Sequence, residues 1–179
     1  MSKPHGIIVF GANGSGKIAI ARELADILNF RHMDIEDYAF LPSEIPYSKE
    51  RTREECIRLM LSDIETYNSF VISAVTGDFG AEIQQMYDIA VFVTAPVEIR
   101  VKRISQREYQ RHGKRILIGG DMHEQYVKFV DFAANRSLSH IEQWAETLAC
   151  PVIRVDGAGD CPVPSIAEIS SFYGTYARR

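Results

Sequence analysis

The sequence predicts an α/β fold built around a parallel sheet, and two observations support that prediction. Short apolar runs alternate with helix-like segments, and the run at 70–75 is apolar almost throughout, as expected of a strand covered on both faces. A glycine-rich turn follows the first run, at 7–10, and leads straight into a helix-like segment. With 179 residues, of which 46% are hydrophobic, we expect a single domain over residues 1–179.

The glycine-rich turn matches the G-x-x-x-x-G-K pattern of a phosphate-binding loop, since it reads Gly11-Ala12-Asn13-Gly14-Ser15-Gly16-Lys17. Such a loop turns successive backbone N–H groups towards a polyphosphate, with the positive end of the next helix behind them. Lys17 is expected to reach the β- and γ-phosphates. The order of strand, loop and helix makes a glycine-rich turn without a nucleotide the weaker alternative.

One position of the phosphate loop departs from the pattern. Ile18 stands where a Ser or Thr hydroxyl usually holds Mg²⁺. The metal ion would then depend on water, on the phosphates and on carboxylates from elsewhere, which is tolerable because Mg²⁺ readily keeps several waters. The departure also leaves open a protein that binds nucleotide and turns it over poorly.

Three carboxylates, Asp34, Glu36 and Asp37, follow the second expected strand at 30–33. In an open α/β sheet, ligands bind beyond the carboxyl ends of the strands, which is where the phosphate loop lies. We therefore expect these acids to face the γ-phosphate, and the alternative is an acidic turn that caps a helix. A carboxylate assists a hydroxyl acceptor as base or orienting group but repels a phosphate acceptor. One or more of the acids could instead serve only Mg²⁺.

Residues 100–115 carry seven basic side chains against one acid, in a chain whose net charge is −4. This asymmetry favours a small anionic ligand over a nucleic acid. Four arginines of an expected helix fall on one stripe, namely Arg100, Arg103, Arg107 and Arg111. Gly113 and the pair Gly119-Gly120 bracket a segment able to close over a triphosphate, so we expect a lid at about 107–120. A solvated basic face is the alternative.

The remaining elements follow from periodicity and from turn residues. Thr52-Arg53-Glu54-Glu55 predicts a capping box at the start of a helix, and an acceptor-binding segment is expected at about 34–66. The third strand ends in a loop that contains Gly77 and Asp78. Further strands are expected at 89–93 and 151–155, a long amphipathic helix from 121 to 148, an adenine-holding turn at 156–160 and a closing helix at 165–173.

With these pieces placed, the chain resembles the small P-loop kinases, the group of adenylate, shikimate and gluconate kinases, over nearly its full length. The resemblance implies a three-layer P-loop NTPase fold, in which a five-stranded parallel sheet of order 2-3-1-4-5 has helices on both faces and carries a lid segment. The phosphate loop is the specific part of this resemblance.

The resemblance also implies roles for single residues. Asp34 and Asp37 would contact the acceptor hydroxyl or Mg²⁺, with Asp34 as the metal ligand and Glu36 as the alternative to Asp37. Residues that would bind the acceptor are Arg53, Gly77 and Asp78. Residues that would embrace the transferring phosphoryl group, together with Lys17, are Arg103 and Arg107.

The predicted function is that of an ATP-dependent kinase that uses Mg²⁺ and moves the γ-phosphoryl group to a small soluble metabolite, with a hydroxyl acceptor favoured. The alternatives are a nucleoside monophosphate kinase and a nucleotide-binding regulatory protein with weak ATPase activity. The expected partners are ATP and the acceptor, with neither nucleic acid nor membrane, and the oligomeric state stays open. The sequence shows no signal segment, and its cysteines are interpreted as free thiols (Cys56, Cys150 and Cys161). We therefore expect the chain to be cytoplasmic.

Overall fold

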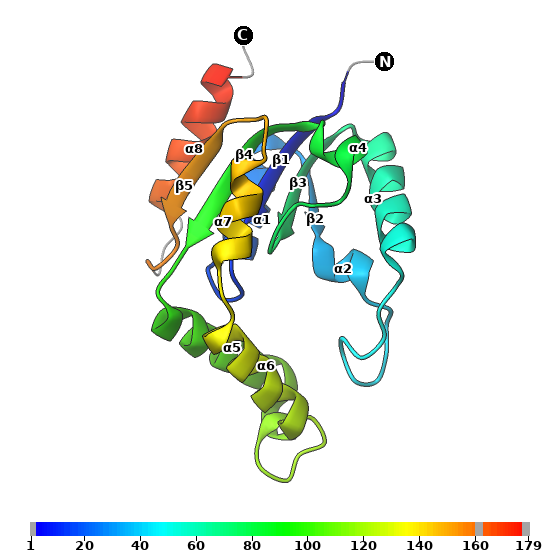
Figure 1. Ribbon diagram of the computed structural model, residues 1–179, viewed down its shortest axis with the longest axis vertical. Coiled ribbons are helices and arrows are strands. Elements are labelled where there is room, and N and C mark those ends of the chain that lie inside the picture. The colour runs from blue at the N-terminus through cyan, green and yellow to red at the C-terminus, as the bar shows by residue number, and fades with distance from the viewer. Residues whose placement is uncertain (1–2, 160–162, 177–179) are drawn as a thin grey trace.

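A single parallel sheet with the strand order β2-β3-β1-β4-β5 forms the centre of the protein (Figure 1). The structure is a computed structural model that describes residues 3–159 and 163–176. The strands are β1 (His5–Phe10), β2 (Arg31–Asp34), β3 (Ser69–Ala74), β4 (Tyr87–Thr94) and β5 (Val152–Asp156). This order confirms the predicted α/β fold and all five predicted strands.

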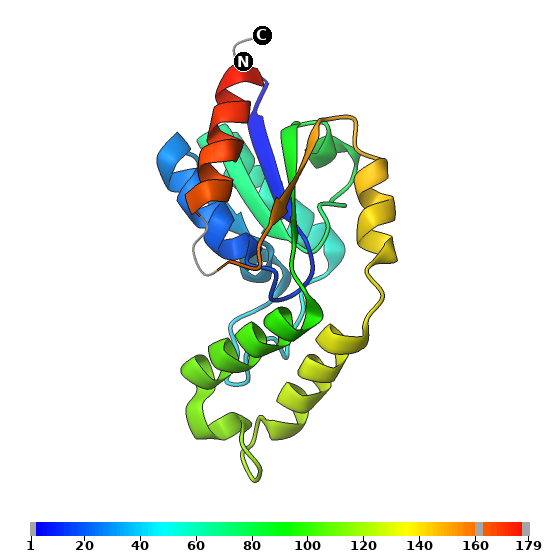
Figure 2. The ribbon, with the colours of Figure 1, turned by 90° about the vertical axis from the view of Figure 1, so that its left-hand side faces the viewer.

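Helices cover both faces of the sheet, which makes three layers (Figure 2). One face packs on α1 (Lys17–Leu28) and α8 (Val163–Tyr176), and the other on α3 (Arg53–Tyr67), α4 (Ala81–Gln84) and α7 (Ser139–Glu146). Strand side chains alternate between two apolar clusters, so that Ile7 and Val9 belong to one and Ile8 and Phe10 to the other. Burial on both faces explains why these strands are apolar throughout.

A helical arm extends from the carboxyl edge of the sheet (Figures 1 and 2). It consists of α5 (Val97–His112), the short 3₁₀ helix η1 (Gly113–Ile116) and α6 (His123–Asn135), and the predicted lid at 107–120 forms its tip. At the tip Arg115 and Asp121 form an ion pair with 2.7 Å between Nη2 and Oδ2, which closes the turn between η1 and α6. The arm thus lies beyond the carboxyl edge of the sheet, next to the loops in which the strands end.

The expectation of one long helix over 121–148 is wrong, because the chain breaks between α6 and α7. Arg136 has extended backbone with φ −64° and ψ 138°. The Ser139 backbone N–H donates to the Ser137 hydroxyl at 3.3 Å, a local bond that competes with helix hydrogen bonding. Apolar periodicity continues across the break, which is why the pattern alone did not reveal it.

Two caps position the segment between β2 and α3. The Asp34 side chain accepts a hydrogen bond from the Glu36 backbone N–H at 3.2 Å and starts α2 (Ile35–Ala39). The predicted capping box of α3 is confirmed, with Thr52 and Glu55 bonded to each other's backbone N–H groups. Between the helices, the 41–49 loop is closed at its base by the Leu41 N–H, which donates to the Lys49 carbonyl at 2.8 Å.

Gly77 is a packing residue rather than an open part of a ligand loop. It is buried, and a Cβ at this position would lie 2.9 Å from atoms of Ile8, Trp144 and Tyr87. Its carbonyl also accepts a hydrogen bond from the Tyr87 hydroxyl at 3.0 Å. The structure therefore does not place Gly77 as an acceptor-binding residue, and gives it the role of letting the 76–80 loop lie close against β1 and α7.

Gly77→Ala should lower the free energy of unfolding by about 1–3 kcal/mol, because the added methyl group overpacks this contact. Urea denaturation of the purified variant measures the effect. Gly174→Ala in α8 is the matched control, since a Cβ there meets nothing within 4 Å and alanine favours a helix. Equal stability of the two variants would contradict the packing role.

Two further findings concern the predicted environment of the chain. Within the part of the chain that the structure describes, none of the helices has both the length and the apolar character needed to cross a bilayer. Cys56 and Cys150 are free thiols, as expected. Cys161 and Asp160, the last residue of the predicted turn at 156–160, lie outside the described residues.

Candidate active site

The phosphate loop adopts the conformation that its glycines permit. Gly14 and Gly16 have φ values of 79° and 99°, in the left-handed region that favours glycine. Gly14 also lies against the backbone of Arg100, where a Cβ would come within 2.9 Å of the Arg100 Cα. Lys17 is the first residue of α1, so the loop passes directly into the positive end of that helix.

Lys17 is a buried cation, and among the described residues no carboxylate forms an ion pair with it. Its Nζ is 3.4 Å from the Ala12 carbonyl oxygen, and only 8% of the residue is exposed. Burial lowers the pKa of Lys17 to about 8, although the nearby carboxylates of Glu36 and Asp34 act in the opposite direction. A buried ammonium group with a lowered pKa is held at the expense of stability, which is typical of a residue that meets an anionic ligand.

A cavity of about 390 Å³ opens on the phosphate loop, and we call it the loop cavity. Its walls come from the loop, from the start of α1 and from α5, with Gly14, Gly16, Lys17, Ile18, Arg22, Arg103, Arg107 and Arg111 among them. Backbone N–H groups and several cations thus face one space, which is the composition of a polyphosphate site. Ile18 borders this space with an aliphatic side chain.

The four arginines of α5 do not act as one stripe. Arg100 is 3% exposed and donates to the carbonyls of Asn13 and Ala133, so it braces the phosphate loop from behind. Arg103 lines the loop cavity, but its guanidinium donates to the carbonyls of Gly157, Ala158 and Gly159. Arg107 and Arg111 are the members of the set that face the cavity from further along the arm.

The break between α6 and α7 brings another cation to the phosphate loop. Arg136 donates from Nη1 to the Asn13 Oδ1 at 3.1 Å and lies 2.7 Å from the His140 Nε2. It is close enough to Lys17 for its charge to lower the lysine pKa. Sequence reasoning missed Arg136 because it was assigned to the middle of a continuous helix.

The acids after β2 take different positions. Asp34 is 8% exposed, and burial raises its pKa despite the hydrogen bond from the Glu36 N–H. Glu36 lines a second cavity, whereas Asp37 is exposed and is absent from the walls of both cavities. Of the two residues that sequence reasoning left as alternatives, the structure brings Glu36 and not Asp37 to the site.

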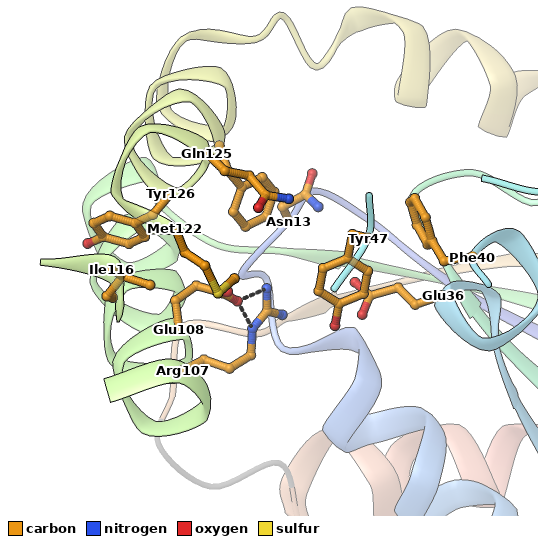
Figure 3. A pocket seen from close by; sticks show the side chains of 11 residues that line it. Asn13, Glu36, Phe40, Tyr47, Arg107, Glu108, Ile116, Met122, Gln125 and Tyr126 are labelled. Atoms are coloured by element: carbon orange, nitrogen blue, oxygen red, sulfur yellow. Dashed lines mark hydrogen bonds and ion pairs between the residues drawn. The ribbon is translucent and has the colours of Figure 1, made fainter. Parts of the chain in front are cut away.

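The second cavity, of about 230 Å³, lies between the helical arm and the 35–50 segment (Figure 3), and we call it the arm cavity. On one side are Asn13, Glu36, Phe40 and Tyr47. On the arm side are Arg107, Glu108, Ile116, Met122, Gln125 and Tyr126. Arg107 lines both cavities and therefore lies between the two spaces.

The 41–49 loop is attached to the arm across the arm cavity. Arg111 Nη1 donates to the Tyr47 hydroxyl at 2.8 Å, and Gln125 Nε2 donates to the Pro46 carbonyl at 3.2 Å. Burial, followed by the charge of Glu36, raises the pKa of Tyr47 to about 12. Tyr47 therefore stays a neutral hydroxyl at physiological pH. From the sequence, this stretch was predicted only to be a loop. The one feature that could have marked it as part of a site is the aromatic residue directly after Pro46.

Two other predicted acceptor residues meet each other outside the arm cavity. Arg53 Nη2 donates to the Asp78 carbonyl at 2.8 Å and lies 3.6 Å from an Asp78 carboxylate oxygen. Both side chains are more than half exposed, and neither lines either cavity. The structure thus joins Arg53 and Asp78, as expected of neighbours at one edge, but does not direct them to the enclosed site.

A magnesium ion would find few protein ligands here. Among the described residues, no group of three His, Cys, Asp or Glu side chains is placed to hold a metal ion. An ion bound to a nucleotide needs fewer, because phosphates and water supply most of its oxygens. Asp34 fits this requirement, since one carboxylate oxygen caps α2 and the group lies near enough to Lys17 for their charges to interact. Asp34 is thus the residue suited to hold Mg²⁺, directly or through water.

The AAA domain family matches residues 7–128, a stretch that includes the phosphate loop, the three acids after β2 and α5. The chain belongs to this family. This AAA-domain protein is also 29% identical over 165 residues to the uncharacterized protein YqaC of Bacillus subtilis (strain 168), a match that covers 88% of this chain and 90% of YqaC.

Solved structures of kinases share the fold of this AAA-domain protein. A sugar kinase from Janibacter sp. HTCC2649 superposes with a TM-score of 0.56 at 16% identity, over 97% of this chain and 96% of that one. A shikimate kinase from Acinetobacter baumannii in complex with shikimate gives 0.52 at 19% identity, over 95% and 94%. At these identities the likeness concerns the fold, and it confirms the predicted resemblance to small P-loop kinases.

Proposed function

We propose that the protein is an ATP-dependent kinase that transfers the γ-phosphoryl group to a hydroxyl of a small molecule. The observation that supports this proposal most directly is the pair of cavities that share Arg107 as a lining residue. One has phosphate-binding chemistry and the other has a carboxylate, Glu36, beside apolar walls. A phosphoryl group carried by the loop cavity would reach an acceptor in the arm cavity beside Arg107.

In the proposed reaction, the backbone N–H groups of the phosphate loop and Lys17 hold the β- and γ-phosphates. Arg107 neutralises charge on the transferring group, and Glu36 accepts or orients the proton of the acceptor hydroxyl. Asp34 lies near Lys17 and would hold Mg²⁺, which would supply further neutralisation of the phosphate oxygens. Positioning and charge compensation are most of what phosphoryl transfer requires.

The test is a screen of hydroxyl-bearing metabolites for Mg²⁺-dependent ADP formation, with the phosphorylated product identified by mass spectrometry. We expect one class of compound to stimulate turnover well above the rate with ATP alone. A second candidate function, a nucleotide-binding regulator with weak ATPase activity, is favoured by Ile18 at the usual place of the metal-binding hydroxyl. ATP hydrolysis that ignored both Mg²⁺ and every acceptor would support the regulator and contradict the kinase.

Nucleotide binding at pH 8 should be accompanied by proton uptake. The pKa of Lys17 in the free protein is about 8, so about half of the molecules carry a neutral lysine at that pH. Phosphate oxygens favour the charged form, and binding therefore raises the pKa and weakens as the pH rises above 8. Without ligand, the free energy of unfolding changes with pH in the opposite direction to the binding affinity. Because burial lowers the pKa of Lys17 in the folded protein, the protein becomes more stable as the pH rises from about 8 towards 10.5.

Calorimetric titration with a nonhydrolysable ATP analogue, in buffers of different ionisation enthalpy, measures this proton uptake. Lys17→Arg is the matched control, because an arginine stays charged throughout and should bind without taking up a proton. The same uptake in Lys17→Arg would assign the proton to another group and refute the assignment to Lys17.

A further inference from the structure

Among the described residues that line the arm cavity, acids outnumber cations, and the nearby Lys17 offsets only part of the charge of Glu36. Among the described residues that line it, Arg107 is the only cation, and its Nε and Nη2 both lie 3.0 Å from the Glu108 Oε1 (Figure 3). Glu108 is 7% exposed, and its other oxygen lies 3.5 Å from the His112 Nε2. Arg107 and Glu108 therefore neutralise each other, which leaves the negative charge of Glu36.

An acceptor that carries a carboxylate or phosphate group is poorly matched to this cavity. It would meet the Glu36 carboxylate, and Arg107, which is already paired with Glu108 and is assigned to the transferring phosphoryl group, has no charge left for a second anion. The other nearby cations already have partners or face the loop cavity: Arg111 donates to the Tyr47 hydroxyl, and Lys17 lines the loop cavity. Arg53 binds Asp78 outside the cavity, and Arg136 holds Asn13 and His140.

The walls of the arm cavity favour a flat ring. Phe40 and Tyr47 lie edge to face on one side, with ring centroids 5.2 Å apart, and Tyr126 and Met122 lie on the arm side (Figure 3). Aromatic rings and a methionine sulfur interact favourably with the face or edge of another ring. The cavity volume of about 230 Å³ is below the roughly 300–1,000 Å³ of sites for drug-sized ligands, so the occupant is small.

Amide groups at the rim supply hydrogen bonds without charge. Gln125 uses its Nε2 to bind the Pro46 carbonyl, so its Oε1 remains as an acceptor. Asn13 uses its Oδ1 to accept from Arg136, so its Nδ2 remains as a donor. A donor and an acceptor beside aromatic walls suit the polar edge of a nitrogen-containing ring.

We propose that the acceptor is an uncharged hydroxyl compound that carries a flat heteroaromatic ring, which is the chemistry of a nucleoside. The ring would lie against the wall formed by Phe40 and Tyr47 and face Met122 across the cavity, while a hydroxyl meets Glu36 beside Arg107. Transfer breaks the bond between the γ-phosphorus and the bridging oxygen of ATP and forms a bond to the acceptor oxygen. The hydroxyl proton passes to Glu36 and then to solvent, and ADP leaves. This assignment rests on the proposed kinase function.

The test compares direct binding of matched ligands by calorimetry, with Mg²⁺ and a nonhydrolysable ATP analogue present and again without them. The ligands are the common ribo- and deoxyribonucleosides, their 5′-monophosphates, shikimate, gluconate and ethanolamine. We expect at least one nucleoside to bind about 10-fold or more tightly than its own monophosphate, since an unpaired charge at a buried site costs at least that much. Tighter binding of the monophosphates, a sugar acid or the amine would overturn the proposal, as would binding of none of the nucleosides.

Two variants test the walls and the charge separately. Phe40→Leu keeps an apolar side chain but removes the ring, and should weaken nucleoside binding by about 2- to 10-fold. Leu41→Ala, a neighbouring exposed residue outside the cavity walls, should leave binding unchanged. Glu108→Gln frees Arg107 and should strengthen monophosphate binding relative to nucleoside binding. An unchanged ratio in Glu108→Gln would contradict the charge argument.

The two proposals fail in different ways. Nucleoside binding without phosphoryl transfer would retain the arm cavity as a nucleoside site and refute the kinase. Mg²⁺-dependent phosphorylation of a sugar acid or a nucleotide would retain the kinase and refute the acceptor assignment. Nucleoside binding is also measured without the ATP analogue. If the protein failed to bind ATP, that result would refute the kinase, while nucleoside binding to the arm cavity could still be tested.

Discussion

Replacing Lys17 with alanine should weaken binding of ATP by roughly 10- to 100-fold, the range expected when a hydrogen-bonded charge is removed from a site. Turnover of any bound ATP should fall by about 10²–10³-fold, because the lysine is a preorganised cation for charge that develops on the phosphates. Calorimetry with a nonhydrolysable analogue gives the affinity, and ADP formation gives the rate.

The stability of Lys17→Ala separates this effect from misfolding. Burial lowers the lysine pKa, so at pH 7 the charged side chain opposes folding, and its removal should leave the melting temperature unchanged or higher. Lys102→Ala is the charge-matched control, since Lys102 lies on α5, is exposed and lines neither cavity. Wild-type ATP affinity in Lys17→Ala would remove the basis for a phosphate site at this loop.

Glu36→Gln should lower kcat by about 10²–10⁴-fold while ATP affinity is retained, because the amide cannot take a proton from the acceptor hydroxyl. The side chain lines the arm cavity and makes no cap, so the substitution should preserve the fold. Steady-state kinetics with the acceptor found in the screen measure kcat and KM.

Two neighbouring acids serve as comparisons for Glu36→Gln. Asp34→Asn keeps the cap of α2, since asparagine caps helices as well as aspartate, and should raise the Mg²⁺ concentration needed for half-maximal activity. Asp37→Asn makes the same chemical change at an exposed position and should retain nearly full activity. If Asp37→Asn lost activity and Glu36→Gln kept it, the geometric assignment of the second acid would be wrong.

The fold was predictable because its signals are local and repeated. Strands buried on both faces leave uninterrupted apolar runs such as 70–75, and the phosphate loop requires glycines at fixed spacing. The break after Asn135 was not predictable in this way, since it depends on side-chain bonds of Ser137 and on tertiary contacts of Arg136. Apolar residues continue at helical spacing on both sides of it.

The site was predictable on its nucleotide side and not on its acceptor side. Phosphate binding depends on one contiguous stretch, Gly11 to Lys17, whereas the arm cavity combines residues from the 35–50 segment and the arm. Spacing alone could not choose between Glu36 and Asp37, because that depends on how the short helix α2 is oriented. Glu108 could have been identified from the sequence as a partner for the arginines, because it is the single acid among seven basic residues at 100–115.

The hydrogen bonds of Arg103 join the arm to the loop that follows β5. The guanidinium holds the carbonyls of residues 157–159, and Gly157 itself lies against the phosphate loop, where a Cβ would come within 3.3 Å of the Ser15 carbonyl carbon. A rotation of the arm must therefore break these bonds or carry the loop after β5 with it. A ligand that binds in the loop cavity and favours one position of the arm is then held more tightly by any contact that favours the same position, because the coupling free energy is reciprocal.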